Sequence, residues 1–294
     1  MPESAPRQAN KNSAEIAPGK LTEVVSNIMS LQEYSELGHT SWPYTYEMHS
    51  GERHLHYFGS SHPGNDIDHP EYRELEEVFR AANPDIVIVE GANMQSQERK
   101  KAFTERLNAL SHKESVARYS ETGLAIKLAT ENNIDWVCPE PTLRSQIEHV
   151  LQSQTKEEVF AWYVLRHLPQ YQRNEPKNGF ETYSQTFIES FKSETNWPDF
   201  DYTYDHALRV AEHVVGDAID VEHIQDASAL VDPIPWKGRP YTTLNRINAT
   251  VSRFRDEEIV RTIAKTLEQH KNVLVVYGGS HAVMQEPALR ALLS

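Results

Sequence analysis

Short stretches of strand-like pattern alternate along the chain with longer stretches of helical spacing. Tyr44–His49 alternates apolar and polar positions, Ser50-Gly51 offers a turn, and Arg53–Phe58 alternates again, which is typical of a β-hairpin. Ile86–Val89 is a continuous run of β-branched residues, which suits a strand covered on both faces. Two further strands are predicted at Asp135–Cys138 and Val273–Tyr277.

Apolar residues at helical spacing predict helices between these strands. In the segment Glu71–Ala82 the residues Leu75, Val78 and Phe79 recur on one face, and Asn83-Pro84 ends the pattern. The other helices predicted around the strands are Gln97–Leu110, Thr122–Glu131, Asp256–Gln269 and Glu286–Leu293. Strands that alternate with helices indicate an α/β fold, and we expect a central mixed β-sheet flanked by helices.

The middle of the chain has a different pattern. From Thr142 to about Val231 it is helical and rich in aromatic residues, so we expect residues 142–231 to form a helical insertion or cap within a single α/β domain of residues 21–294. The aromatic side chains there either form a core between helices or line a substrate pocket. Residues 1–20 are rich in Pro, Ser, Asn, Gln and Ala, and we expect a disordered tail rather than a signal peptide.

Charge and composition exclude several classes of protein. The 29 Lys and Arg against 43 Asp and Glu give a formal charge of −14, which repels phosphate backbones and argues against a nucleic-acid partner. No run approaches the roughly 18 apolar residues that a membrane helix needs, so no membrane partner is expected. Cys138 is the single cysteine, which excludes an intramolecular disulfide and a zinc site built on cysteines. We expect a cytoplasmic protein, and a homo-oligomer is left open.

Three predicted strands end in residues that can carry chemistry. Gly59-Ser60-Ser61-His62 ends one strand and Gly278-Gly279-Ser280-His281 ends another, so the pattern Gly-x-x-His occurs twice. Glu90 follows directly after the strand Ile86–Val89. Since ligands of α/β folds collect at the carboxyl ends of the strands, we expect His62, Glu90 and His281 to converge there.

Two imidazoles and one carboxylate can do hydrolytic chemistry in two ways. They can hold a divalent metal ion with positions left open for water and substrate, and such an ion lowers the pKa of a bound water towards neutrality. Alternatively one histidine acts without metal as the general base that activates water, with Glu90 orienting it. The sequence leaves both open.

Further residues near these strand ends are candidates for supporting roles. Asp66 and His69 either add ligands or form a turn rich in side-chain hydrogen bonds. The segment around Ser280 is similar to a nucleophile elbow. However, the residues after His281 contain neither Asp nor His, so a serine triad lacks its partners and we place Ser280, like Ser61, as a hydrogen-bonding residue behind the centre.

The combination of motifs resembles the TraB/Tiki superfamily, which also includes erythromycin esterase-like and ChaN-like proteins. The resemblance covers about residues 46–138 and 245–294. The segments that carry it are Gly59-x-x-His62, Val87–Glu90, Arg255-Asp256 and Val275-x-Tyr277-Gly278-x-x-His281.

The resemblance implies a mixed sheet flanked by helices with His62, Glu90 and His281 as the active centre. Tiki-like members are metal-dependent peptidases, esterase-like members hydrolyse a macrolide lactone, and ChaN-like members bind haem. By the same match, Glu121 and Glu140 are further acidic positions. Arg255 either faces the site, where it could stabilise an oxyanion, or forms a salt bridge with a neighbouring acid.

The leading hypothesis is therefore a peptidase- or amidase-like hydrolase that uses a divalent metal ion, namely manganese, cobalt or zinc, on a small peptide-like or ester substrate. Glu121 or Glu140 would shuttle protons and Arg255 would stabilise charge. One rival is a metal-independent esterase with His62 as the base. The other is a binding protein for haem or another metal-containing ligand, with His69 or Tyr277 assisting.

Overall fold

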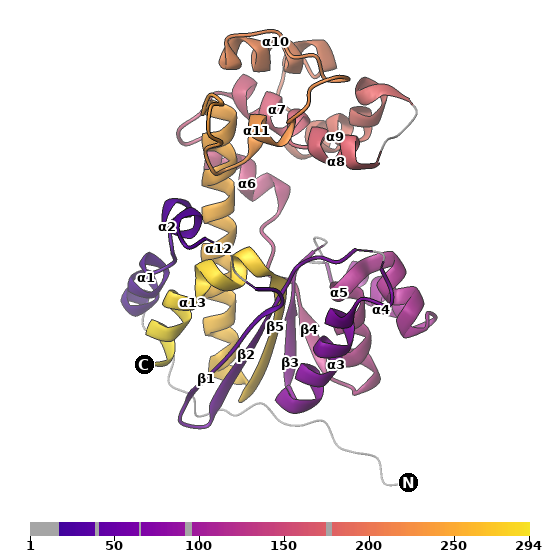
Figure 1. Cartoon of the computed structure of the whole chain (residues 1–294), viewed down its shortest axis with the longest axis vertical. Coiled ribbons are helices and arrows are strands. Elements are labelled where there is room, and N and C mark those ends of the chain that lie inside the picture. Colours follow the sequence, from indigo (N-terminus) through magenta and orange to yellow (C-terminus); the bar gives the residue numbers. More distant parts are fainter. Residues whose placement is uncertain (1–17, 39–40, 65, 92–95, 175–177) are drawn as a thin grey trace. The chain divides into compact units, whose positions relative to one another are not determined.

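The computed structural model describes residues 18–38, 41–64, 66–91, 96–174 and 178–294 (Figure 1). Most of the tail expected at residues 1–20 lies outside the described residues, and residues 18–20 belong to the first helix, α1 (Pro18–Ser26). The chain divides into two compact units. Unit 1 consists of Met1–Glu140 and Asp256–Ser294, and unit 2 of Pro141–Arg255.

Unit 1 is built on a five-stranded mixed sheet, which confirms the predicted α/β fold. The strands are β1 (Tyr44–Ser50), β2 (Arg53–Ser60), β3 (Ile86–Val89), β4 (Asp135–Val137) and β5 (Asn272–Gly278). Their order is β1-β2-β5-β3-β4, with β1 antiparallel to β2 and the other neighbours parallel. The predicted hairpin and the three other predicted strands are all present.

The strand order brings three carboxyl ends together. β5 lies between β2 and β3, so the two strands that end in Gly-x-x-His are direct neighbours. Ser60 is in register with Gly278, and Val89 with Val276. As a result the residues that follow β2, β3 and β5 leave the sheet at one edge.

Helices cover both faces of this sheet. On one face lie α3 (Pro70–Ala82), α4 (Gln97–Asn108) and α5 (His112–Glu131), and on the other α1, α13 (Gly279–Leu293) and the unit 1 part of α12 (Thr243–Gln269) (Figure 1). The short helix α2 (Leu31–Glu36) precedes β1. Alternate residues of β5 serve the two cores, since Val275 packs with the α12–α13 face and Val276 with the α3–α5 face.

Helix starts differ most from the sequence expectation. We expected a helix to begin at Glu286, directly before Pro287, but α13 begins at Gly279 and holds Pro287 in its interior. Ala282, Met284 and other residues of α13 are buried against the sheet, and this burial outweighs the hydrogen bond that Pro287 cannot donate. The helix expected at Thr122–Glu131 is the part of α5 (His112–Glu131) that follows a kink at Ser120.

Unit 2 is helical and has a hydrophobic core of its own. Its helices are α6 (Leu143–Val150), α7 (Lys156–Leu165), α8 (Leu168–Asn174), α9 (Gly179–Thr195), α10 (Tyr204–Val215), α11 (Ser228–Val231) and the first part of α12. Phe160, Trp162, Phe180 and Phe191 are fully buried, so these aromatic residues form the core between helices. The unit extends to Arg255 rather than Val231 because α12 residues such as Leu244 pack into the same core. Among the described residues no helix is both long and apolar enough to cross a bilayer.

Candidate functional site

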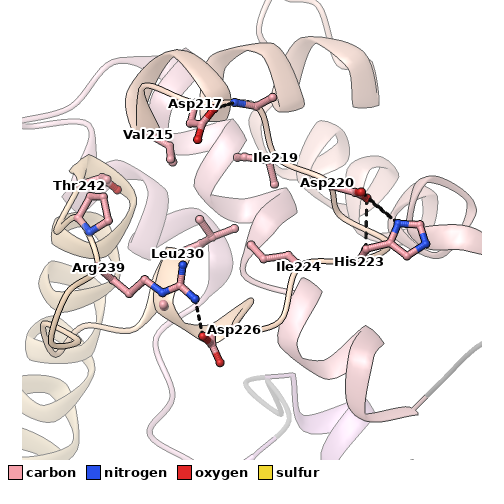
Figure 2. A pocket seen from close by; sticks show the side chains of 13 residues that line it. Val215, Asp217, Ile219, Asp220, His223, Ile224, Asp226, Leu230, Arg239 and Thr242 are labelled. Carbon is pink, nitrogen blue, oxygen red and sulfur yellow. Dashed lines mark hydrogen bonds and ion pairs between the residues drawn. The ribbon is translucent and has the colours of Figure 1, made fainter.

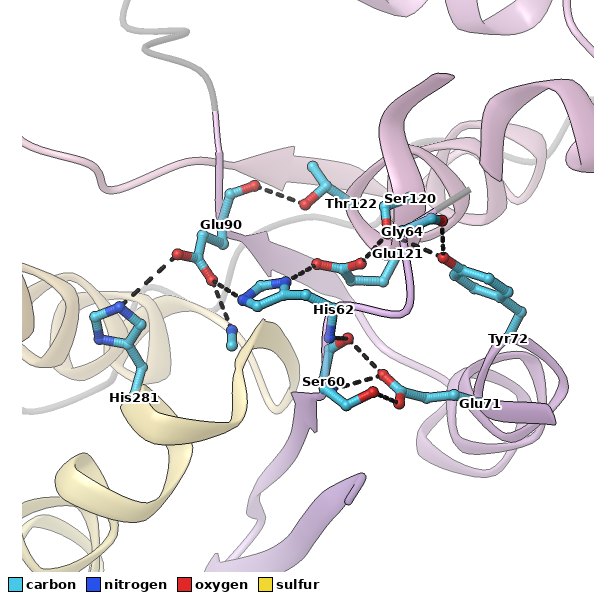
Figure 3. A network of polar contacts seen from close by, with 12 residues as sticks. Ser60, His62, Gly64, Glu71, Tyr72, Glu90, Ser120, Glu121, Thr122 and His281 are labelled. Carbon is cyan, nitrogen blue, oxygen red and sulfur yellow. Dashed lines mark hydrogen bonds and ion pairs between the residues drawn. The ribbon is translucent and has the colours of Figure 1, made fainter. Parts of the chain in front are cut away.

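His62, Glu90 and His281 meet at the carboxyl edge of the sheet (Figure 3). Glu90 lies between the two imidazoles, with Oε2 3.7 Å from His62 Nε2 and Oε1 3.8 Å from His281 Nε2. Both distances are longer than a direct hydrogen bond. The Gly278 backbone N–H donates to Glu90 Oε2 at 2.6 Å. Because Gly278 caps α13, the Glu90 carboxylate also lies at the positive end of that helix.

A buried carboxylate holds the other nitrogen of each imidazole. His62 Nδ1 lies 2.6 Å from Glu121 Oε1, and His281 Nδ1 lies 2.7 Å from Asp256 Oδ1. Glu121 and Asp256 are only 4% and 2% exposed. A carboxylate on Nδ1 fixes the orientation of the ring and leaves Nε2 for a ligand or a proton. Both Nε2 atoms face Glu90.

The backbone around His62 is held in an unusual conformation. His62 has a φ of 57°, in the left-handed region that non-glycine residues seldom occupy. Its N–H donates to Ser60 Oγ at 3.0 Å. Gly278 leaves room for the ring, since a Cβ there would lie 2.5 Å from His62 Nε2. The His62 side chain is nevertheless 53% exposed, so solvent reaches it.

Glu71, at the start of α3, organises the loop that carries His62. Its buried carboxylate accepts hydrogen bonds from the Ser60 hydroxyl, from the Ser61 N–H at 2.9 Å and from the Ser61 hydroxyl at 2.5 Å. Ser61 therefore supports the histidine loop through Glu71.

Tyr72, the next residue of α3, contacts Ser120, whose hydroxyl binds the carboxylate that holds His62. Its hydroxyl donates to Gly64 O at 2.6 Å and lies 2.9 Å from Ser120 Oγ (Figure 3). The Ser120 hydroxyl donates in turn to Glu121 Oε2. Ser120 has φ 53° and ψ −145°, a conformation that costs about 1–3 kcal/mol and is found mainly at functional sites.

The surroundings of His281 are buried and helical. His281 lies in the first turn of α13, and its side chain is 8% exposed. Asp256 Oδ1 also accepts from Gln285 Nε2 at 2.6 Å, and Gln285 Oε1 accepts from the Tyr57 hydroxyl at 2.9 Å. The Tyr277 ring packs edge-on against the His281 ring, with centroids 5.8 Å apart.

The contact between His62 and Glu121 shifts the pKa values of both groups. The hydrogen bond to Glu121 raises the pKa of His62 against the opposing effect of burial. Burial acts to raise the pKa of Glu121, but the hydrogen bonds from His62 and Ser120 outweigh it and the pKa is lowered. Both shifts favour a proton on His62 and a charge on Glu121. His62 is thus a stronger base than a free imidazole.

Tyr277, whose ring packs against His281, is influenced by the charge of Glu140. Glu140 follows β4 and is 7% exposed. Burial first, and then the Glu140 charge, raise the pKa of Tyr277 well above its usual value. The Tyr277 hydroxyl is buried and has no hydrogen-bond partner within the described part of the chain.

The remaining predicted residues are spread over several places. Ser280 is half-buried in the first turn of α13. Arg255 is the last residue of unit 2, directly before Asp256 in the sequence. Asp66 and His69 form a turn, since Asp66 O accepts from His69 N at 3.0 Å and His69 Nδ1 accepts from Glu71 N at 3.4 Å as the cap of α3. Of the two interpretations of this pair, the structure therefore shows the turn.

Six residues that form hydrogen bonds around His62 and His281 were not predicted from the sequence. These are Glu71, Tyr72, Ser120, Asp256, Gln285 and Tyr57. Asp256 stands next to Arg255 in a segment that the family resemblance includes, and this adjacency was the one available hint. The others lie on helices or strands whose pattern indicates only burial.

A separate pocket of about 350 Å³ lies within unit 2 (Figure 2). Its apolar wall includes Val215, Ile219 and Leu230. Polar residues at the pocket form ion pairs with one another, with Arg239 2.5 Å from Asp226 and His223 3.0 Å from Asp220. None of the site residues predicted from the sequence lines this pocket.

Comparisons with models of known protein families, with curated proteins and with solved structures give no match to this chain.

Proposed function

We propose that the protein is a hydrolase of the TraB/Tiki type, with His62, Glu90 and His281 as its reactive centre. One observation carries this proposal. Both imidazoles bind a buried carboxylate through Nδ1, and both turn Nε2 towards opposite oxygens of Glu90. Two imidazoles that share this arrangement are suited to act together on one bound molecule.

The residues can move both protons that hydrolysis requires. When water attacks the carbonyl carbon of an amide or ester it loses a proton, and the leaving group gains one. His62 is accessible and its Nε2 can take the first proton, while Glu121 stabilises the resulting imidazolium. His281, held by Asp256, can supply a proton from the opposite side of Glu90.

The same residues suit a divalent metal ion. Two imidazole nitrogens and one carboxylate are ligands that Mn²⁺, Co²⁺ and Zn²⁺ accept, and histidines that bind metal usually have a carboxylate on the other nitrogen. As the side chains of the described residues stand, no three His, Cys, Asp or Glu are gathered closely enough to hold an ion. To hold one ion together, the two imidazoles would have to approach each other as well as Glu90. When bound, the ion would lower the pKa of water and polarise the substrate carbonyl.

A second candidate is an esterase that works without metal. The hydrogen bond between His62 and Glu121 favours it, because this pair has the geometry of a base oriented by a carboxylate and needs no ion for that role. We propose small peptide-like or ester substrates in both cases. With an acidic chain and a single cysteine, we also propose a cytoplasmic location.

A substrate screen with matched variants tests the proposal. Wild-type protein is freed of metal, supplied with Mn²⁺, Co²⁺, Zn²⁺ or none, and assayed on dipeptide amides and p-nitrophenyl esters. His62→Ala is the test variant. His223→Ala is the control, because His223 is an exposed imidazole that also has a carboxylate, that of Asp220, on Nδ1.

We expect turnover that falls at least about 100-fold in His62→Ala and is unchanged in His223→Ala. Activity that needs an added ion supports the metal-dependent form, and full activity without one supports the esterase. Equal activity in wild type and His62→Ala, or no hydrolysis of any substrate, would overturn the proposal.

A further inference from the structure

The hairpin β1–β2 carries four side chains of the metal-ligating kind on one face. Glu47 is directly opposite His56, and His49 is directly opposite His54. Because alternate residues of a strand share a face, Glu47 and His49 of β1 lie on the same face as His54 and His56 of β2. We call these four residues the hairpin cluster.

The members of the hairpin cluster already lie close together. Glu47 Oε1 is 3.7 Å from His56 Nε2 and 3.9 Å from His54 Nδ1, so one carboxylate oxygen lies near two imidazole nitrogens. The His49 ring stacks on the His54 ring, with centroids 6.1 Å apart and planes 28° from parallel. Directly opposite residues of paired strands have Cβ atoms about 4.5–5.5 Å apart, which suits side chains that share an ion.

The opposite face of the hairpin explains why these polar residues point outward. Met48, Leu55 and Tyr57 are buried in the core under α12 and α13, which leaves the hairpin cluster on the other side. The side chains of Glu47 and His54 are 57% and 41% exposed, and that of His56 is 16% exposed.

We propose that the hairpin cluster binds one divalent transition-metal ion of the Zn²⁺ type through His49, His54, His56 and Glu47. Three imidazoles and one carboxylate make a complete tetrahedral set, which is typical of a structural site rather than a catalytic one. Two ligands of a tetrahedral zinc lie about 3.4 Å apart, so the two contacts of Glu47 need to shorten by only a few tenths of an ångström. As the side chains of the described residues stand, no three of them are close enough to hold an ion, so the imidazoles of His54 and His56 have to turn towards each other. His49 needs to turn its ring, and it is exposed.

Binding here would reinforce a vulnerable part of the sheet. β1 is an edge strand that pairs with β2 alone, and an ion held by both strands would tie this edge down. The net charge of −14 favours cations near the surface. The hairpin cluster shares no residue with the proposed hydrolytic centre, so this inference does not depend on the proposed function.

Zinc titration of the full-length protein by calorimetry tests the inference. The titrations are made in the His62→Ala background, which removes a ligand of the other candidate metal site. The test variant adds His49→Gln and His54→Gln, and the control adds His213→Gln and His223→Gln, two exposed histidines of unit 2. Glu47→Gln separately probes the carboxylate. Thermal unfolding is measured with and without Zn²⁺.

The expected result is about one Zn²⁺ per chain in the His62→Ala background and in the control. In the test variant the affinity falls at least about tenfold, and Zn²⁺ no longer raises the unfolding temperature. Absence of Zn²⁺ binding in the His62→Ala background, or equal weakening in the test variant and the control, would overturn the inference. Hydrolysis at the wild-type rate in the His62→Ala background, together with intact Zn²⁺ binding by the hairpin cluster, would count against the proposed function alone.

Discussion

The two Gly-x-x-His segments have the same sequence pattern but different structures. His62 lies in a loop, with a left-handed backbone and a side chain that is 53% exposed. His281 lies in the first turn of α13, with a side chain that is 8% exposed. A shared motif therefore gives one accessible imidazole and one that is fixed in the core.

The hydrogen bonds behind the two imidazoles are nevertheless similar. His62 is held by Glu121, and the contacts continue through Ser120 to the Tyr72 hydroxyl. On the other side the contacts run from His281 through Asp256 and Gln285 to the Tyr57 hydroxyl. Each side ends in a tyrosine, and Glu90 lies between the two. In the proposed reaction this difference gives the two imidazoles different parts, in which the accessible His62 takes the proton of water and the buried His281 supplies one from the other side of Glu90.

The largest effects are expected when either imidazole is removed. His62→Ala and His281→Ala should each lower kcat/KM by about 10²–10⁴-fold. His281→Ala should be the less stable of the two, because it leaves a cavity in the core, whereas the His62 ring is 53% exposed. Each variant also takes one hydrogen bond from a buried carboxylate that keeps another, from Ser120 to Glu121 and from Gln285 to Asp256. Urea unfolding measures this difference. Equal destabilisation by the two variants would contradict the different burial of the two imidazole rings.

The next largest effects should follow from neutralising the carboxylates behind the imidazoles. Glu121→Gln and Asp256→Asn keep the shape but lose the charge, and activity should fall about 10–100-fold in each. Glu121→Gln should also lower the pKa of His62, since the hydrogen bond to Glu121 is the main cause of its raised value. An NMR titration of the His62 ring measures this shift, and an unchanged or higher pKa would show that Glu121 does not act in this way.

Substitutions at Gly278 and Gly279 compare two neighbouring positions beside the histidines. A Cβ at Gly278 would lie 2.5 Å from His62 Nε2 and 3.1 Å from Glu90 Oε2, whereas one at Gly279 would meet the Trp42 ring at 1.8 Å. We expect Gly278→Ala to displace the His62 ring and lower kcat about tenfold or more. Gly279→Ala should lower the unfolding temperature with a smaller loss of kcat. The reverse order would mean that the Trp42 contact matters more than the position of His62.

The smallest effects are expected at the two tyrosines. Tyr72→Phe should lower activity a few-fold by loosening Ser120 and Glu121. Tyr57→Phe leaves the buried Gln285 side chain one hydrogen bond short, which should cost about 1–2 kcal/mol of stability with little change in activity. Parallel kinetic and unfolding measurements on both variants check this contrast. It fails if Tyr57→Phe is the less active of the two.

The sequence predicted the strands and the strand ends well, because their signals are local. Alternation and β-branched runs marked all five strands, and parallel pairing brought Gly59-x-x-His62, Glu90 and Gly278-x-x-His281 to one edge of the sheet. Asp256, Gln285 and Glu71 could not be predicted from hydrophobic pattern, because they approach the site only through tertiary packing of α12, α13 and α3. The start of α13 was wrong because Pro287 favours a helix start, and burial of the preceding turns overrides this preference.

The most direct test of the account is a comparison of three variants, His62→Ala, His281→Ala and the double variant, assayed on the best substrate. If the two imidazoles act as one centre around Glu90, removal of either one abolishes their joint action. The double variant should then have about the same activity as the less active single variant. Independent losses that multiply in the double variant, or a single variant that stays within about tenfold of wild type, would contradict a shared centre.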